Sequence, residues 1–215
     1  MQNLARVCLL IAALIVVAPS VTTGQPLMSG VKIGIDISSL PNAGEVFDQV
    51  VKQTSTETSA KFGVTFGGFV ILPITGQFSL QPELMFVGKG VKLKEATNNG
   101  TVTASLRYLE FPLLLRYATT VGNYPAFLLV GPTLGIKAST GAHLDGPNGT
   151  VDYDIDSAVR NFDGGIAFGG GIDYHHYVFE VRYTLGLSDI ASDVFPHTDA
   201  LKNRVFAVLA GYRFK

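Results

Sequence analysis

Long runs in which apolar and polar residues alternate dominate this 215-residue chain. The clearest run begins Phe179, Glu180, Val181, Arg182, Tyr183, Thr184. A period of two places successive side chains on opposite faces of a β-strand. Several runs are longer than an ordinary strand of about 5–6 residues, and no segment after residue 30 keeps a helical period over three turns. The chain is therefore predicted to be all-β.

Eight such runs are predicted as strands, at 30–38, 61–72, 77–91, 103–119, 124–138, 161–175, 177–188 and 203–214. The connections between them alternate between long and short, with tight turns at 73–76, at 120–123 and between Tyr174 and Tyr177. Four long connections then lie at one end of the sheet, opposite three short turns and both termini. This pattern predicts an eight-stranded antiparallel up-and-down transmembrane β-barrel, as found in bacterial outer membranes. In such barrels the short turns and termini are periplasmic and the long loops are extracellular.

Residues 1–24 are predicted to be a secretory signal peptide, which leaves 25–215 as the barrel domain. Arg6 provides the positive charge of the N-terminal region of a signal peptide, and residues 7–18 form an apolar run followed by small residues. Twelve apolar residues are too few to span a bilayer, which needs about 20. The single cysteine, Cys8, lies in this segment, so the mature chain has no thiol for a disulfide or a metal site.

The composition argues against nucleic-acid binding and favours a membrane-facing exterior. The net charge is −1 and charged residues make up only 15% of the chain, so it has no basic excess for a polyanion. A soluble lipocalin-like barrel would turn its apolar face inward. Here the alternate face carries balanced charges and many small residues, which suit a narrow lumen, and aromatic residues gather at the short-turn end of the apolar face. The apolar face is therefore predicted to face lipid.

The polar face contains a candidate network of buried charges. Ten charged residues are predicted to point into the lumen: Asp36, Glu83, Glu110, Asp173, Glu180, Lys32, Lys61, Lys89, Arg116 and Arg182. The candidate site residues among them are Glu83, Glu110, Arg116, Glu180, Arg182 and Asp36. A carboxylate–guanidinium network would lock neighbouring strands and plug the pore, because eight strands enclose little more than their own side chains. The alternative is a selective ion or proton path, as in a small passive channel.

Five basic residues fall on the lipid-facing register near the long-loop ends of their strands: Lys92, Lys94, Arg107, Arg160 and Arg204. The outer leaflet of a Gram-negative outer membrane presents phosphates at about this depth. These residues are therefore candidates for a cationic collar that binds lipopolysaccharide phosphates. The alternative is that these residues lie at strand ends without a ligand, with their long side chains extending the charged groups into water.

Other chemistry is weakly supported. Asp152, Asp154 and Asp156, with Asp163, imitate the start of a calcium loop, but Ser157 stands where glycine is needed. An extended strand explains the alternation at 152–156 better, so no metal or cofactor is expected. His143 and His197, with Ser139, Ser188 and Ser192, lack an organised serine motif. An enzyme, such as an outer-membrane lipid-modifying enzyme, is therefore not the expected function.

Several segments, in order along the chain, resemble the PorT-like outer-membrane β-barrel family. They are Gly30–Gly34, Phe78–Phe86 with Lys89–Gly90, Tyr108–Tyr117, Gly131–Pro132, Val181–Tyr183, Gly186–Leu187 and Gly211–Phe214. The resemblance implies a single eight-stranded barrel in the outer membrane, and the namesake member serves a protein secretion machine. It carries no functional residue over to this chain.

A non-enzymatic outer-membrane barrel with a structural or interaction role through its external loops is therefore expected. The expected partners are outer-membrane lipid or lipopolysaccharide, the barrel-assembly machinery during biogenesis, and subunits of a secretion machine.

Overall fold

The computed structural model describes residues 27–41, 43, 56–95, 101–146, 149–153, 157, 159–190 and 201–214. The predicted signal peptide at 1–24 lies outside them. The strands are β1 (Met28–Ser39), β2 (Thr56–Thr75), β3 (Phe78–Glu95), β4 (Thr101–Val121), β5 (Tyr124–Gly146), β6 (Gly149–Tyr153), β7 (Phe162–Tyr174), β8 (Tyr177–Gly186) and β9 (Arg204–Arg213). None of the described residues belongs to a helix long and apolar enough to cross a membrane.

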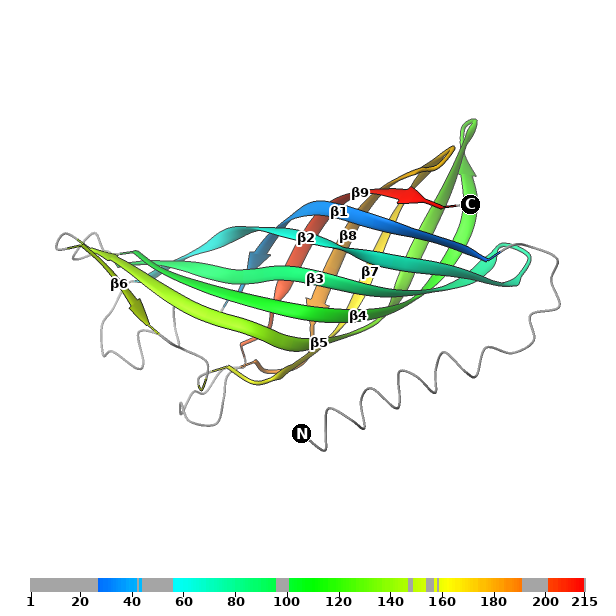
Figure 1. Ribbon diagram of the computed structural model, residues 1–215. Helices are drawn as coiled ribbons and strands as arrows, with labels where there is room; N and C mark the ends of the chain where they lie inside the picture. Colours follow the sequence, from blue (N-terminus) through cyan, green and yellow to red (C-terminus); the bar gives the residue numbers. More distant parts are fainter. Residues whose placement is uncertain are drawn as a thin grey trace.

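Eight of these strands close into a barrel (Figure 1). The order of neighbours is β4-β3-β2-β1-β9-β8-β7-β5, and pairing of β4 with β5 joins the two ends. Each neighbouring pair is antiparallel. The ninth strand, β6, pairs with the end of β5 from Ala142 to Gly146. The predicted eight-stranded up-and-down barrel is confirmed, and β6 covers the start of the segment predicted as an extended strand at 152–156.

Three two-residue turns define one end of the barrel, called here the short-turn end. They lie at 76–77, 122–123 and 175–176. The first residue of each turn has a positive φ, 50° at Gly76, 60° at Gly122 and 55° at His175. Two-residue hairpin loops require this conformation because it matches the right-handed twist of the flanking strands. The predicted positions of the tight turns are therefore confirmed.

Strands β2 to β5 extend far beyond the other strands at the opposite end, called here the long-loop end (Figure 1). Pairing of β1 with β2 stops at Lys61, and pairing of β7 with β5 stops at Ile136. Beyond these points, residues 56–60, 91–95, 101–107 and 137–146 continue as a curved sheet that β6 extends. We refer to this part of the sheet as the wall. The wall extends further than predicted, because the fifth strand was predicted to end at residue 138 and β5 ends at Gly146.

The apolar face of each strand points outward and the polar face points inward. On β1, Val31, Ile33 and Ile35 are exposed, whereas Lys32 and Asp36 are buried. The same alternation runs along β8 and β9. An exterior of exposed isoleucine, valine and phenylalanine around a buried charged interior is the inverse of a soluble barrel. The prediction that the apolar face is the outer face is confirmed.

Aromatic side chains form a group on the outer surface at the short-turn end. The ring centroids of Phe78 and Tyr117 lie 5.1 Å apart, and those of Tyr177 and Tyr212 lie 5.6 Å apart. Phe214 lies 6.0 Å from Tyr212. Amphipathic rings concentrate at the boundary between lipid and water, so this group marks one edge of the membrane-facing band, as predicted.

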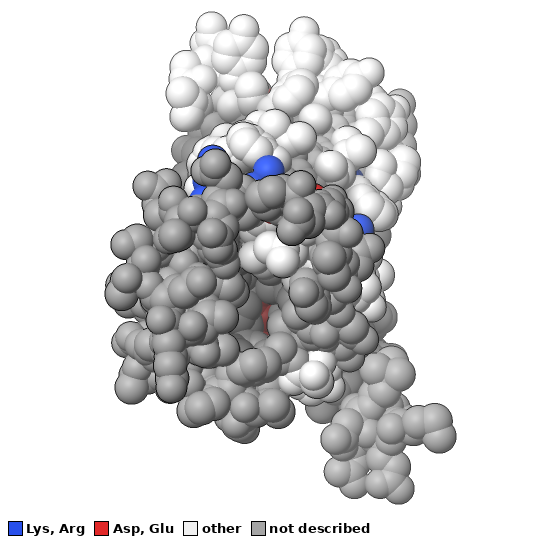
Figure 2. Space-filling model, turned by 90° about the vertical axis from the view of Figure 1, so that its left-hand side faces the viewer, with Lys and Arg blue, Asp and Glu red and all other residues white. Residues whose placement is uncertain are grey.

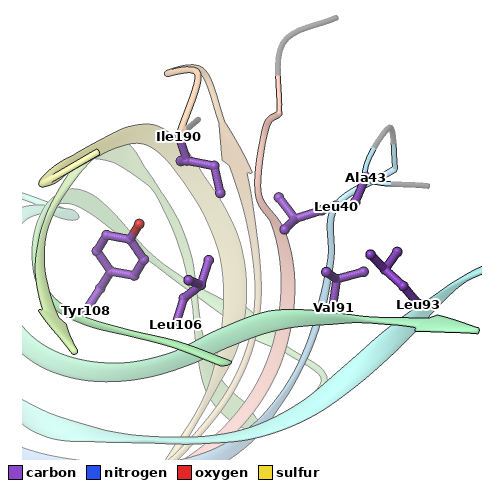
Figure 3. Packing of buried hydrophobic residues seen from close by; sticks show 7 residues of the cluster. All are labelled: Leu40, Ala43, Val91, Leu93, Leu106, Tyr108 and Ile190. Atoms are coloured by element: carbon purple, nitrogen blue, oxygen red, sulfur yellow. The ribbon is translucent and has the colours of Figure 1, made fainter. Parts of the chain in front are cut away.

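The lumen also contains apolar clusters that the alternation did not predict. At the long-loop end, Val91 and Leu93 of β3 and Leu106 of β4 point from the wall toward Leu40 and Ile190 (Figure 3). These last two residues follow β1 and β8, so the segments after those strands fold against the inner face of the wall. A second cluster includes Phe69, Ile71, Leu114 and Phe127. Apolar packing therefore fills parts of the lumen that charge alone does not.

Adjacent glycines on β2 provide a test of this inside–outside assignment. A Cβ on Gly67, which points inward, would overlap the Leu84 carbonyl oxygen and lie 2.7 Å from Met85 Sδ. A Cβ on Gly68, which points outward, would have its nearest neighbour at 3.6 Å. Gly67→Ala is expected to lower the free energy of unfolding by about 1–3 kcal/mol through overpacking. Gly68→Ala is the matched control and is expected to be neutral or stabilising by up to about 1 kcal/mol. Urea unfolding in detergent measures both, and equal effects would contradict the assignment.

Candidate functional site

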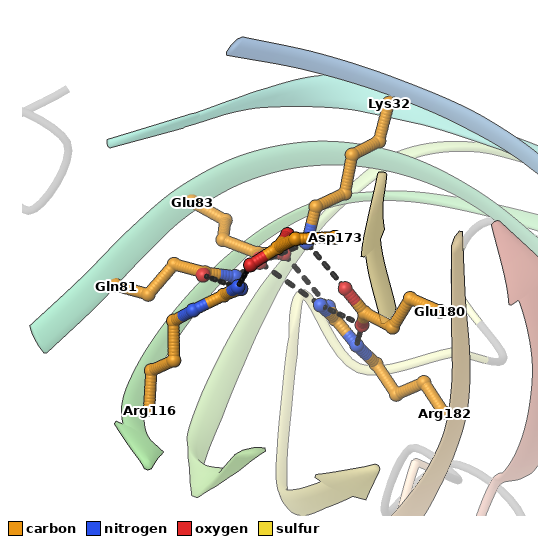
Figure 4. Close-up of polar contacts among 7 residues, drawn as sticks. All are labelled: Lys32, Gln81, Glu83, Arg116, Asp173, Glu180 and Arg182. Carbon is orange, nitrogen blue, oxygen red and sulfur yellow. Dashed lines mark hydrogen bonds and ion pairs between the residues drawn. The ribbon is translucent and has the colours of Figure 1, made fainter. Parts of the chain in front are cut away.

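A network of buried ion pairs crosses the middle of the lumen, with Glu83 of β3 at its centre (Figure 4). The Glu83 carboxylate accepts hydrogen bonds from Lys32 Nζ at 2.8 Å and from Arg182 Nη1 at 2.7 Å. Glu180 of β8 bonds the same two cations, at 2.5 Å from each. The Glu83 and Glu180 side chains are 0% exposed. Strands β1, β3 and β8 are thus tied together across the barrel interior.

An arm of this network reaches β4 and β7 through Arg116. The Arg116 guanidinium donates to Gln81 Oε1 at 3.0 Å, and Gln81 donates in turn to Glu83 at 2.6 Å. Arg116 also pairs with Asp173 at 2.5 Å, and Arg213 lies 3.4 Å from the same carboxylate. The guanidinium carbon is 3.6 Å from the centre of the Phe127 ring, a close stacking contact that desolvates the cation.

A second, separate cluster of charges lies closer to the long-loop end. Lys89 of β3 forms ion pairs with Glu110 of β4 and with Asp163 of β7, the latter at 2.8 Å. Asn203 donates to Asp163 at 2.7 Å. Lys89 Nζ lies 5.1 Å from the centre of the Tyr108 ring. One lysine therefore pairs with two carboxylates, and these come from strands that are not neighbours.

The single network predicted from sequence is thus divided. Glu83, Arg116, Glu180 and Arg182 belong to the first network, and Glu110 belongs to the second cluster. Asp36 is buried but neither of its carboxylate oxygens has a hydrogen-bond partner among the described residues. The expected guanidinium pairing is wrong for Glu110, because the inward residue that reaches it is Lys89.

Sequence reasoning assigned Asp163 to a partial calcium motif, whereas the structure places it in the lumen with Lys89 and Asn203. The signal was present in the sequence, because Asp163 has the same parity on β7 as the inward Gly165 and Ala167. Among the described residues no group of three or more acidic, histidine or cysteine side chains is arranged to hold a metal. Asp154 and Asp156 lie outside the described residues.

The serine and histidine side chains considered as catalytic candidates form hydrogen bonds with arginine side chains or with the backbone. Ser139 accepts from Arg107 at 3.3 Å, and Ser188 accepts from the Gly164 amide at 2.8 Å. His176 contacts the Arg213 carbonyl at 3.3 Å in the 175–176 turn. His197 and Ser192 lie outside the described residues.

The five proposed collar residues are all exposed, but they lie on two sides of the barrel. Lys92 and Lys94 of β3 and Arg107 of β4 share the outer face of the wall, where threonines oppose both lysines. Arg204 begins β9, which lies opposite β4 in the ring of eight strands. Arg160 precedes β7. Figure 2 views the long-loop end and shows lysine and arginine side chains at its surface. The positive charge is concentrated on the wall rather than spread evenly around a collar.

The lumen as a whole has the properties of a plug. The first network, the second cluster and the apolar clusters together bury side chains from all eight strands of the ring. Desolvation offsets much of the attraction within a buried ion pair. Removing either partner is strongly destabilising, because it leaves an uncompensated buried charge. The geometry therefore supports a rigid, filled barrel.

A family model matches most of the chain, and several solved structures are similar to it. The family model for the outer membrane protein β-barrel domain matches residues 23–192. No curated protein matches the chain. Among solved structures, OprG from Pseudomonas aeruginosa is 16% identical and has a TM-score of 0.45, with 87% of this chain and 95% of that chain covered. Ail of Yersinia pestis, solved with the heparin analogue sucrose octasulfate, is 13% identical with a TM-score of 0.43, covering 88% and 100%. Neisserial surface protein A is 10% identical with a TM-score of 0.40, covering 89% and 99%.

The family match extends over most of the chain and includes β1 through β8. It agrees with the closed antiparallel ring and with the apolar exterior. The strands therefore cross the outer membrane, and the chain belongs to the outer membrane protein β-barrel domain family.

Proposed function

We propose that this protein is a non-conducting, non-enzymatic membrane anchor whose wall serves as an interaction surface outside the cell. The observation that carries the proposal is the contrast between the two sides of the wall. Its inner face is packed against the segments that follow β1 and β8, whereas its outer face presents Lys92, Lys94 and Arg107 to the surroundings. In this orientation the short turns and termini are periplasmic, as in other outer-membrane barrels.

Lipopolysaccharide phosphates are the proposed ligands of the outer face. Arg107 and Lys92 lie on the same face of the β3–β4 pair, where Arg107 opposes Gly88 and Lys92 opposes Thr103. Arg107 also donates to Ser139 on β5, which holds the guanidinium against the sheet. Cations fixed on a rigid sheet near the membrane surface attract anionic headgroups, with a contribution of about 1 kcal/mol for each cation. Arg160 and Arg204 would provide weaker contacts elsewhere on the rim.

Reversing the three wall charges tests this assignment. Lys92→Glu, Lys94→Glu and Arg107→Glu together are expected to weaken binding of lipopolysaccharide by at least a factor on the order of 100, from the loss of three attractive contacts. Lipopolysaccharide that co-purifies in gentle detergent from native outer membranes provides the measurement. The matched control exchanges the cations but keeps their charge, with Lys92→Arg, Lys94→Arg and Arg107→Lys. Unchanged co-purification in the reversed variant would refute the phosphate-binding role.

Protein partners are the second part of the proposal. Like other outer-membrane barrels, the chain would depend on the barrel-assembly machinery for insertion, and the PorT-like resemblance suggests an accessory role in a protein secretion machine. Mass spectrometry of proteins that co-purify with the tagged barrel tests the accessory role. Recovery of secretion-machine subunits would support it, and recovery of lipopolysaccharide alone would refute it.

A further inference from the structure

The outer face of the wall begins with an abrupt change from apolar to charged residues. The register places Phe86 of β3, Leu109 of β4 and Ile136 of β5 in one row across three strands. The next outward-facing residue on β4 is Arg107, which is exposed. The lipid-facing band therefore ends between Leu109 and Arg107. A lipid of the outer leaflet has its acyl chains beside the apolar row and its headgroup beside the residues that follow.

Two exposed cations are spaced along this polar surface. Arg107 lies in a row with Gly88 of β3 and Ser139 of β5, and it donates to Ser139 Oγ at 3.3 Å. Lys92 lies two rows further from the membrane, opposite Thr103 of β4. Because a strand rises about 3.4 Å per residue, the four residues from Arg107 to Thr103 separate the two rows by about 14 Å. Positive charges at the two ends of this span suit a ligand that is anionic at both ends.

The row between the two cations has no large side chain. It consists of Gly90 of β3, Ser105 of β4 and Gly141 of β5. A Cβ on Gly141 would meet no other atom within 4 Å, so packing within the barrel does not require glycine at this position. Glycine inside a strand weakens it, and it often marks a place where a ligand approaches the backbone closely. A flat polar surface therefore lies between Arg107 and Lys92.

The acidic residues at outward positions of the wall leave Lys92 available for an anion. Glu57 of β2 lies opposite Lys94. Asp145 and Asp152 lie on β5 and β6, two and three strands from the lysines of β3. Lys92 instead lies opposite residues with hydroxyl groups on both neighbouring strands. Lys92 is therefore better placed than Lys94 to bind an anion together with Arg107.

We propose that the outer face of the wall binds the phosphorylated disaccharide headgroup of an outer-leaflet glycolipid. The patch that binds it consists of Gly90, Lys92, Thr103, Ser105, Arg107 and Gly141. The inference rests on the phosphate-binding role proposed above and adds the part of the ligand that lies between the phosphates. The Arg107 guanidinium binds the phosphate nearer the membrane, and the Lys92 ammonium binds the outer one. The sugar rings lie on the row between them, where the hydroxyl groups of Ser105 and Thr103 bond sugar hydroxyls.

Binding of lipid A, a disaccharide with one phosphate at each end, tests the two-ended contact. The wild-type barrel in detergent is titrated with lipid A and with monophosphoryl lipid A, and native mass spectrometry gives the two dissociation constants. Removal of one phosphate leaves one cation without its partner. Monophosphoryl lipid A is therefore expected to bind about fivefold more weakly. Equal affinities for the two lipids would overturn the proposal.

Gly141→Leu tests the contact with the sugar rings. The substitution keeps every cation, and the open space at Gly141 lets the barrel fold. The variant is expected to bind lipid A at least about fivefold more weakly, because displaced rings take one phosphate out of reach of its cation. Its binding of phosphatidylglycerol, which has a phosphate but no sugar ring, is expected to be unchanged. Gly68→Leu is the matched control, an outward glycine of the apolar band with its nearest neighbour 3.6 Å from an added Cβ, and it is expected to change neither affinity.

Failure of this inference and failure of the phosphate-binding role give different results. If Gly141→Leu binds lipid A as tightly as the wild type, the rings do not lie on the row, and the inference is overturned even when reversal of the three wall charges abolishes binding. If the charge-reversed variant keeps the wild-type affinity for lipid A, the phosphate-binding role fails and this inference fails with it. Loss of affinity in both variants, with wild-type affinity in Gly68→Leu, supports both.

Discussion

Glu83→Gln is expected to lower the free energy of unfolding by about 3–5 kcal/mol, the usual result of removing one partner of a buried ion pair. The Glu83 carboxylate accepts hydrogen bonds from Lys32, Gln81 and Arg182. A glutamine of the same shape leaves Lys32 and Arg182 sharing the single negative charge of Glu180. One buried cation is then uncompensated. Urea unfolding of the barrel in detergent, monitored by the heat-dependent shift in gel mobility, measures the loss of free energy of unfolding.

A double-mutant cycle with Arg182→Met separates this effect from a general loss of packing. If the two residues act as a pair, the combined variant loses much less stability than the sum of the single variants. Simple additivity of the two losses would show that Glu83 and Arg182 do not depend on each other, which contradicts the bidentate geometry at 2.7 Å and 2.9 Å.

Lys89→Met is expected to have an effect of similar size, about 3–5 kcal/mol. Lys89 is the base that pairs with both Glu110 and Asp163, so its loss leaves two buried carboxylates that also repel each other. The matched control is Lys92→Met, three residues further along the same strand, where the side chain points outward and is exposed. Surface changes of this kind usually stay within about 0.5 kcal/mol.

A compensating variant makes the Lys89 prediction more specific. Adding Glu110→Gln and Asp163→Asn to Lys89→Met removes the two stranded charges, and it is expected to restore part of the lost stability. Equilibrium unfolding compares the single and triple variants. A triple variant that is less stable than Lys89→Met would show that the charges are not the source of the loss.

The alternation of residues determined most of the architecture in advance. Strand number, the positions of the tight turns and the outward direction of Val31, Ile33 and Ile35 all follow from a period of two, because lipid contact leaves an uninterrupted apolar face. The same parity placed Glu83, Glu180 and Arg182 inside the barrel. The alternation also places Asp163 on the inward face of β7, but the sequence analysis assigned this residue to a partial calcium-loop motif.

Partner choice within the lumen could not be predicted in this way. Parity states which face a side chain occupies, whereas pairing across the lumen depends on the tilt of the strands and on which side chains reach the same height. Lys89 therefore pairs with Glu110 and Asp163, whereas the Asp36 carboxylate has no hydrogen-bond partner among the described residues. The apolar cluster at the long-loop end was not predicted, for a different reason. Leu40 and Ile190 lie in connections, where no periodic signal indicates that a residue packs inside.

Conductance of the purified wild-type protein in planar lipid bilayers tests whether the barrel is filled. The charge network and the apolar clusters predict a membrane current indistinguishable from that of the bilayer alone, at either polarity. Stable, reproducible conductance steps from correctly folded protein would mean that ions pass the network formed by Lys32, Glu83, Glu180 and Arg182, and that the barrel is not filled.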